Sequence, residues 1–173
     1  MPILTSQIVW NVMLSGILSL AAWRWGDWRH WRRYHATILY VVVCDLLYNV
    51  LAYNHRLWVY QPNHIGINLV AMFINYPCTM LLYLPHYPNG HRRKQLLYIA
   101  FWVVIWSVIE AIYRAIDGIT YQNGWTFWYS VEFDVLMFIM SRLHLQRPLL
   151  TYILSVPITC VMLFTYVPLR SIR

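Results

Sequence analysis

Residues 34–53 read YHATILYVVVCDLLYNVLAY, an apolar run of 20 residues with one acidic side chain, Asp45, near its middle. A helix needs about 20 mostly apolar residues to cross the hydrocarbon core of a bilayer, so this run predicts a transmembrane helix. One similar run precedes it and four follow. The expected spans are Thr5–Trp23, Tyr34–Tyr53, Ile65–Pro85, Gln95–Ala115, Gly124–Leu143 and Leu149–Val167. The sequence therefore predicts an all-α, polytopic transmembrane bundle of about six spans, with residues 1–173 forming a single domain.

The overall composition agrees with this fold class. The chain is 60% hydrophobic, 17% aromatic and only 11% charged, whereas soluble domains average about 25% charged residues. This excludes an ordinary cytosolic enzyme, a disordered chain and a disulfide-stapled secreted domain. The three cysteines are odd in number and lie within apolar runs, so we expect neither a disulfide framework nor a zinc site. The first apolar run lacks the basic region of a signal peptide and is long enough to span, so we expect it to remain as a helix.

The basic residues predict an orientation rather than a nucleic-acid surface. The net charge is +7, but Lys and Arg occur in short clusters between apolar runs, where they contact lipid headgroups and set topology. Nine lie in the loops after the first, third and fifth spans: Arg24, Arg29, Arg32, Arg33, Arg92, Arg93, Lys94, Arg142 and Arg147. Four lie on the other side: Arg56, Arg114, Arg170 and Arg173. The positive-inside rule therefore places both termini of this multi-pass cell-membrane protein outside the cytoplasm.

The first of these loops, WRWGDWRHWRR (residues 23–33), alternates tryptophan with arginine. Tryptophan prefers the headgroup level of a bilayer, and arginine there reaches lipid phosphate. We expect a membrane-interface anchor that contacts anionic headgroups, formed by Trp25, Trp28, Trp31, Arg29, Arg32 and Arg33; a docking surface for another protein is the alternative. Trp125 with Trp128, and Trp58 with Tyr60, predict the aromatic belt at the opposite interface.

Four carboxylates fall inside the predicted spans: Asp45, Glu110, Glu132 and Asp134. An ionised acid in hydrocarbon costs about 2.5–3.5 kcal/mol, so each must face the bundle interior, lose its charge or find a partner. Polar residues also recur at helical spacing, which places them on one face of each helix. These stripes are Asn11, Ser15 and Ser19; Asp45 and Asn49; Asn68, Asn75 and Thr79; Thr126, Ser130 and Asp134; and Thr151, Ser155 and Thr159. They predict a polar seam shared by the helices.

Helix geometry predicts how deep in the membrane each residue of the polar seam lies. At a rise of about 1.5 Å per residue, Asp45 lies about 16 Å from the cytoplasmic end of its helix, and Asp134 about 15 Å from the outer end of its own. Asn75 falls at a similar level, next to Pro77, which is expected to kink its helix. A second layer nearer the outer face comprises Asn11, Asn49, Asn68, Glu110 and Glu132. We expect an outward-facing, partly hydrated acidic funnel that ends at Asp45, Asn75 and Asp134 and attracts protons or cations.

Two interpretations of the seam stay open. Facing aspartates at low dielectric share a proton or hold a cation; alternatively, the polar residues only join the helices, through hydrogen bonds of about 0.6–2 kcal/mol each.

Glu110 has Arg114 one turn away, and we expect the two to pair. Glu132 points away from the face of Asp134. The candidate ligand- or ion-binding residues are Asp45, Asn49, Asn75, Glu110, Glu132 and Asp134.

No cofactor, metal site or catalytic residue is expected. The chain has seven histidines, but it contains no HExxH or CxxCH spacing and no glycine-rich phosphate loop. Of the histidines, His35 and His144 come nearest to membrane depth, at opposite helix ends. An intramembrane enzyme is therefore the weakest interpretation, because no nucleophile–base spacing is present.

A resemblance covers residues 65–150. It rests on FINYPCTMLLYLPHYP (Phe73–Pro88), WSVIEAIYR (Trp106–Arg114), GITYQNGWTFWYS (Gly118–Ser130) and MSRLHLQRP (Met140–Pro148). These segments resemble an uncharacterised family of small multispanning membrane proteins of spore-forming Firmicutes. The matching positions are Tyr76, Pro77, Glu110, Tyr121, Trp125 and Trp128. The resemblance implies a membrane protein of a Gram-positive host and carries no assigned activity; the first two spans, including Asp45, resemble the family less.

Two functions from different classes follow. The first is a small transport or sensing protein that binds or conducts a proton, cation or cationic solute through Asp45 and Asp134. Because a chain of 173 residues is small for alternating access, this function is expected to require a homo-oligomer or a larger membrane complex. The second is a non-catalytic membrane subunit that acts by assembly with partner proteins.

Overall fold

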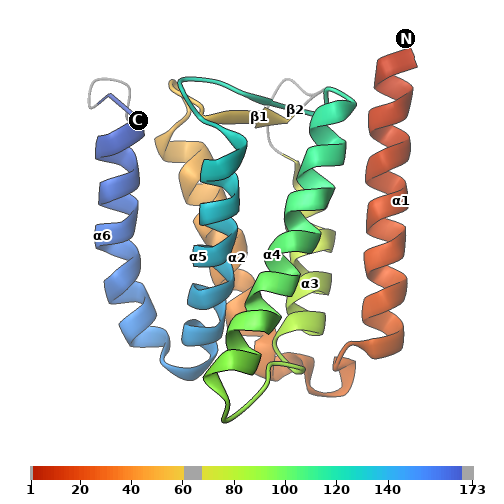
Figure 1. Cartoon of the computed structure of the whole chain (residues 1–173), viewed down its shortest axis with the longest axis vertical. Helices are drawn as coiled ribbons and strands as arrows, with labels where there is room; N and C mark the ends of the chain where they lie inside the picture. The colour runs from red at the N-terminus through yellow and green to blue at the C-terminus, as the bar shows by residue number, and fades with distance from the viewer. Residues whose placement is uncertain (1, 61–67, 169–173) are drawn as a thin grey trace.

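The computed structural model describes residues 2–60 and 68–168, which are helical apart from loops and one short strand pair (Figure 1). Six α-helices lie in this part of the chain. They are α1 (Pro2–Trp25), α2 (Trp31–Leu51), α3 (Tyr76–Tyr83), α4 (Arg92–Ala115), α5 (Phe127–Gln146) and α6 (Pro148–Tyr166). A 3-10 turn, Trp28–His30, leads into α2, and a π-helical segment, Ala71–Asn75, leads into α3. The predicted all-α class is confirmed.

Four helical segments are long and apolar enough to cross a membrane: Gln7–Trp25, Trp28–Leu51, Arg92–Ala115 and Pro148–Tyr166. They coincide with the first, second, fourth and sixth predicted spans. The fifth predicted span corresponds to α5, whose 20 residues include Glu132, Asp134 and Arg142, and these charges lower its hydropathy. The bundle is therefore compatible with a multi-pass membrane protein.

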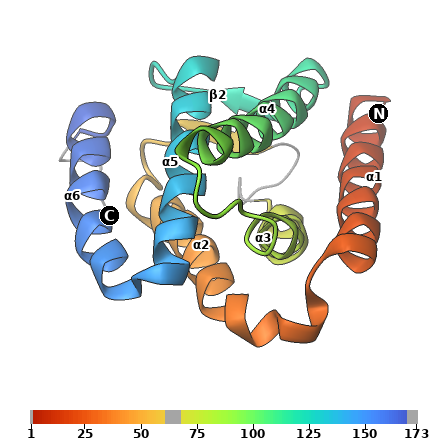
Figure 2. The same ribbon diagram turned by 60° about the horizontal axis from the view of Figure 1, so that its bottom comes forward.

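The two ends of the bundle differ. One end, here called the strand end, holds both ends of the described chain together with strands β1 (Trp58–Tyr60) and β2 (Ile119–Tyr121) (Figure 1). At the other, here called the basic end, the connections α1–α2, α3–α4 and α5–α6 turn back. Helices α1 and α6 lie on opposite flanks, with α2 to α5 between them (Figure 2). The predicted arrangement, with both ends of the chain on one side, agrees with this layout.

The third predicted span is the least regular. Its residues Ile65–Ile67 lie outside the described residues; helix runs over residues 69–83. Asn68 caps the start, since its Oδ1 accepts from the Ala71 N–H at 3.1 Å. The π-helical segment then comes directly before Pro77, and the Tyr76 N–H donates to the Ala71 carbonyl, five residues back. Proline has no N–H to continue the α-helical ladder, so a widened turn, rather than a simple kink, accommodates it.

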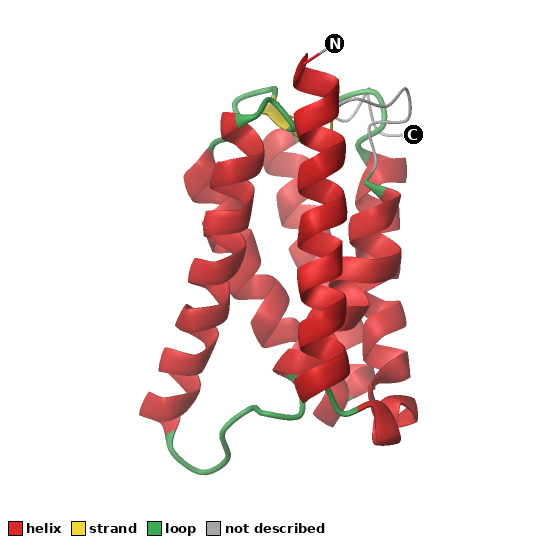
Figure 3. Cartoon of the chain, turned by 90° about the vertical axis from the view of Figure 1, so that its right-hand side faces the viewer, coloured by secondary structure: helices red, strands yellow, loops and turns green. Residues whose placement is uncertain are grey.

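The strand pair was not predicted. β1 and β2 are antiparallel, with Trp58 opposite Tyr121 and Tyr60 opposite Ile119. Figure 1 shows the two strands side by side at the strand end of the bundle, and Figure 3, in which α1 faces the viewer, shows a short piece of strand in yellow at the same end. Three-residue strands carry too little alternation to be recognised in a sequence. They matter because they bring side chains from two connections over the interior of the bundle.

Two aromatic clusters form the core. Near the basic end, Tyr83 packs between Tyr98 and Phe138, and its hydroxyl donates to the Phe138 carbonyl at 3.0 Å. Near the strand end, Trp58 stacks on Tyr48 with ring centroids 3.9 Å apart and also contacts Trp125.

The predicted outer aromatic belt is therefore only partly correct. Trp125 is 7% exposed and belongs to the second cluster, and Trp58 is covered by Tyr48; both form core rather than belt. Trp128 is 72% exposed, as a belt residue would be. The difference arises because β1 folds Trp58 back over the bundle instead of leaving it at its edge.

Candidate functional site

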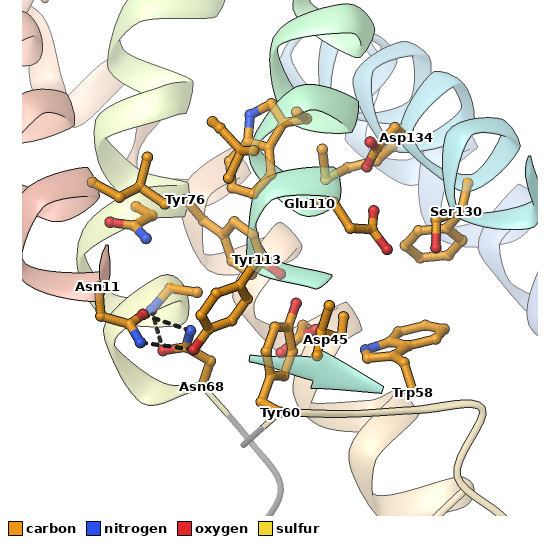
Figure 4. A pocket seen from close by; sticks show the side chains of 18 of the residues that line it. Asn11, Asp45, Trp58, Tyr60, Asn68, Tyr76, Glu110, Tyr113, Ser130 and Asp134 are labelled. Atoms are coloured by element: carbon orange, nitrogen blue, oxygen red, sulfur yellow. Dashed lines mark hydrogen bonds between the residues drawn. The ribbon is translucent and has the colours of Figure 1, made fainter. Parts of the chain in front are cut away.

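A cavity of about 90 Å³ lies inside the bundle, between the two aromatic clusters (Figure 4). Helices α1 to α5, the π-helical segment and both strands contribute to its wall. Its carboxyl groups are Asp45, Glu110 and Asp134; its other polar side chains include Asn11, Asn68, Asn75 and Ser130; its aromatic rings are Trp10, Trp58, Tyr60, Tyr76, Trp106, Tyr113, Trp125 and Phe133. None of the described lining residues is Lys, Arg or His. The wall is thus acidic and aromatic.

Asp134 is the most isolated of the three acids. Its side chain is 9% exposed, and its Oδ2 has no hydrogen-bond partner among the described residues. Helical periodicity puts it on the same face of α5 as Ser130, one turn earlier, which turns both toward the cavity. The carboxyl group with which Asp134 interacts electrostatically is Glu110 on α4. A buried carboxylate oxygen without a partner is rare and calls for an explanation.

Glu110 accepts a hydrogen bond from the Tyr121 hydroxyl at 2.5 Å. The Arg114 guanidinium packs over the ring of the same tyrosine, 4.5 Å from its centroid. Both Glu110 and Arg114 are described, and no ion pair joins them, although the two charges interact electrostatically. The predicted ion pair is replaced by two contacts with Tyr121 of β2: its hydroxyl bonds the acid and its ring contacts the base. The pKa of the Tyr121 hydroxyl is raised, first by burial and then by its bond to Glu110, so it acts as a donor.

Asp45 is partly buried and lines the cavity from α2. Asn49, one turn later, donates to the Asp45 carbonyl at 2.8 Å and to its carboxylate at 3.4 Å. The Tyr76 hydroxyl also interacts with this carboxylate. Asn49 is buried but is not part of the cavity wall, so it orients Asp45 rather than meeting a ligand.

Asp45 and Asp134 line one cavity but are not hydrogen-bonded to each other. Both side chains are described, and no hydrogen bond joins them. Both interact electrostatically with the hydroxyls of Tyr60 and Tyr76, and Asp134 also interacts with Glu110. The two aspartates therefore share a wall that contains Tyr60 and Tyr76, without sharing a proton directly.

The α1 side of the seam is joined by hydrogen bonds. Asn68 donates to Asn11 Oδ1 at 3.0 Å, and Asn11 donates to the Tyr113 hydroxyl at 2.7 Å (Figure 4). Ser15 donates to Asn75 Oδ1 at 2.8 Å. Asn75, predicted as an ion ligand, therefore has this oxygen engaged across the helices. On the α1 side of the seam, the polar residues therefore join the helices by hydrogen bonds, as the second interpretation expects.

Glu132 is exposed and does not line the cavity. Two residues along a helix turn a side chain through about 200°, so Glu132 and Asp134 cannot share a face. The structure therefore brings together Asp45, Asn75, Glu110 and Asp134, leaves Asn49 behind Asp45, and separates Glu132.

Sequence reasoning missed the residues that the strands supply. Tyr60 lies in the wall, and burial raises the pKa of its hydroxyl well above the ordinary value, so it too stays protonated.

Two tryptophans on helices were missed as well: the indole N–H groups of Trp10 and Trp106 lie in the wall and have no hydrogen-bond partner among the described residues. The high aromatic content was the available signal, but composition does not say which rings face inward.

The predicted interface anchor lies at the basic end and is open to its surroundings. Trp25, Trp28 and Trp31 are 62%, 45% and 45% exposed. The arginines of this segment, Arg29, Arg32 and Arg33, are also exposed. Asp27 is the exception to the basic pattern: it accepts from the Tyr34 hydroxyl at 2.9 Å and lies 2.8 Å from His30 Nδ1.

Comparison of the chain with family models, with curated proteins and with solved structures finds no match. The resemblance over residues 65–150 stays a prediction, and function is argued from the cavity alone.

Proposed function

We propose that this is a six-span membrane protein that binds a proton or small cation in its acidic cavity, as a carrier or sensor. The observation that supports this most is Asp134. Its Oδ2 is buried without a hydrogen-bond partner, beside Glu110, in a wall that contains no basic side chain among its described residues.

The energetic reason is the cost of buried negative charge. An ionised carboxylate inside a membrane costs about 2.5–3.5 kcal/mol or more unless it is paired. Three carboxyl groups face one cavity; the nearby Arg114 does not line it and forms no ion pair with Glu110. We therefore expect protons or a bound cation to neutralise the wall.

The proposed topology places this cavity toward the outside. Nine basic residues lie in the connections at the basic end or in the adjoining helix ends, and the positive-inside rule assigns this end to the cytoplasm. The cavity has β1 and β2 in its wall and so lies toward the strand end. A cation would enter from the extracytoplasmic side of the cell membrane.

The exposed tryptophans and arginines of residues 23–33 support contact with anionic lipid headgroups. Vesicles of phosphatidylcholine with and without phosphatidylglycerol test this: the replacement of Arg29, Arg32 and Arg33 by Gln is expected to abolish a preference for the anionic lipid.

Assembly is the second candidate function, and the flanking helices favour it. Only 6% of the apolar window of α6 and 17% of that of α1 are buried within one chain. We propose that copies of this chain, or partner subunits, cover part of these faces, which would also supply the mass that transport requires. Cross-linking in native membranes, followed by mass spectrometry, tests this; only monomers and lipid contacts would contradict it.

The test of cation binding uses the purified protein in proteoliposomes. Proton or cation uptake is expected to be lost in Asp134→Asn and reduced in Asp45→Asn, because each loses a charge in the cavity wall. Glu132→Gln is the matched control: it removes a charge from the same helix but outside the cavity, and it is expected to retain uptake. Full uptake in both cavity variants would contradict the proposed site.

A further inference from the structure

The cavity wall is built for an organic cation rather than a bare metal ion. Among the described residues, no group of three His, Cys, Asp or Glu side chains could hold a metal ion. Aromatic rings supply much of the wall instead, and Tyr76 and Trp106 contact each other with centroids 5.5 Å apart. Aromatic faces attract ammonium groups within about 6 Å, most strongly where water is excluded.

The volume limits the size of this cation. The cavity measures about 90 Å³, less than the roughly 150 Å³ of an engineered cavity that binds benzene, while one water occupies about 30 Å³ in the liquid. A ligand of about three or four non-hydrogen atoms fits these limits. A smaller ion leaves space for water, which can accept from the unpartnered indole N–H groups of Trp10 and Trp106.

The unpartnered oxygen of Asp134 indicates which functional group the ligand carries. Glu110 already accepts from Tyr121, and Asp45 from Asn49. Asp134 Oδ2 is buried and accepts from no described residue. An N–H group of the ligand would donate a hydrogen bond to this oxygen, whereas a quaternary ammonium ion has no N–H to donate.

We propose, building on the cation-binding function above, that the ligand is a small alkylammonium ion with at least one N–H. The N–H donates to Asp134 Oδ2, Glu110 contributes negative charge beside it, and the alkyl groups contact the aromatic wall. Selectivity against sodium and potassium comes from that wall, and selectivity against quaternary ions comes from Asp134.

The experiment is a calorimetric titration of the whole detergent-solubilised protein. The probes are the chlorides of methylammonium, dimethylammonium, trimethylammonium, tetramethylammonium, sodium and potassium at constant ionic strength. The first three are expected to bind. Tetramethylammonium is expected to bind about tenfold more weakly or worse, since it forfeits a charge-assisted hydrogen bond and is one methyl group larger than trimethylammonium.

Variants test the two contacts separately. Asp134→Asn is expected to weaken methylammonium binding about tenfold or more, with Glu132→Gln unchanged. Trp106→Leu is expected to weaken binding of every alkylammonium probe, and Trp106→Phe, which keeps an aromatic face, to restore it.

The outcomes separate the two proposals. If sodium or potassium binds as tightly as methylammonium and depends on Asp134, the cation site stands and the ligand class is wrong. If tetramethylammonium binds as tightly as trimethylammonium, the proposed N–H contact is wrong. If no probe binds and the proteoliposomes show no Asp134-dependent uptake, both proposals are overturned. The probe series needs no variant, so a substitution that fails to fold does not prevent a decision.

Discussion

At the residue scale, Tyr121 decides the environment of Glu110. Its hydroxyl donates to the carboxylate, and the guanidinium of Arg114 packs over its ring. The tyrosine thereby satisfies one oxygen of the acid and contacts the base, while Arg114 itself does not line the cavity. A direct Glu110–Arg114 ion pair, the simplest expectation from their spacing, would have neutralised one of the three acids.

Tyr121→Phe tests this arrangement. The variant keeps the ring and removes the donor to a buried carboxylate, so the free energy of unfolding is expected to fall by about 1.5–3 kcal/mol. Thermal unfolding in detergent measures the loss. Tyr152→Phe, at a ring that is 51% exposed, is the control and is expected to change little. Equal stability of both variants would contradict the role given to the Tyr121 hydroxyl.

Asp27 gives the basic end a pH dependence. The hydrogen bond from His30 is the main cause that lowers the pKa of Asp27 below its ordinary 3.8, and the Tyr34 hydroxyl adds to it. A lowered pKa means that this contribution to stability is complete above about pH 4 and is lost as the pH falls through the lowered value. The melting temperature of the wild type is expected to exceed that of Asp27→Asn at pH 6, and the gap to narrow as the pH falls further below 4. A gap that does not narrow at any acidic pH at which the protein still folds would contradict the assignment.

At the element scale, the joint between α4 and β2 determines how the cavity is closed. Gly118 lies in this joint, and a Cβ there would meet the ring of Tyr113. Tyr113 lines the cavity and accepts from Asn11 of α1. A small residue at position 118 therefore lets α4, β2 and α1 meet around one side chain.

Gly118→Ala is expected to displace the Tyr113 ring and to lower the free energy of unfolding by about 1–3 kcal/mol, as overpacking does. Gly16→Ala is the matched control, because a Cβ there meets nothing within 4 Å. That variant is expected to be as stable as the wild type or more stable by about 0.5–1 kcal/mol, since alanine favours the helix over glycine. Thermal melts compare the two; similar losses in both would show that the Tyr113 contact is not the cause.

At the scale of the whole molecule, charge is divided between the two ends of the bundle. The arginine-rich connections lie at the basic end, while the acidic cavity lies toward the strand end. This division is what orients the proposed cation pathway, and it makes the topology directly testable.

A membrane-impermeant maleimide can report which end faces outward. In intact cells, Gln122→Cys at the strand end is expected to be labelled, whereas Asn89→Cys at the basic end is expected to react only after the membrane is opened. The unmodified chain, with free Cys44, Cys78 and Cys160, provides the background. Labelling of Asn89→Cys in intact cells would reverse the proposed orientation.

The sequence by itself determined the all-α class and which acids required explanation. Apolar runs of membrane length form helices because backbone groups in hydrocarbon must be satisfied within the segment, and helical periodicity already separates Asp134 from Glu132. The tertiary structure alone decided which groups lie together: Asp134 and Glu110 in one cavity wall, Tyr121 in contact with both Glu110 and Arg114, and Asn75 with Ser15. Such contacts join segments that are distant in the chain, and they depend on how the helices rotate against one another and on the pairing of two three-residue strands. No local pattern encodes either of these.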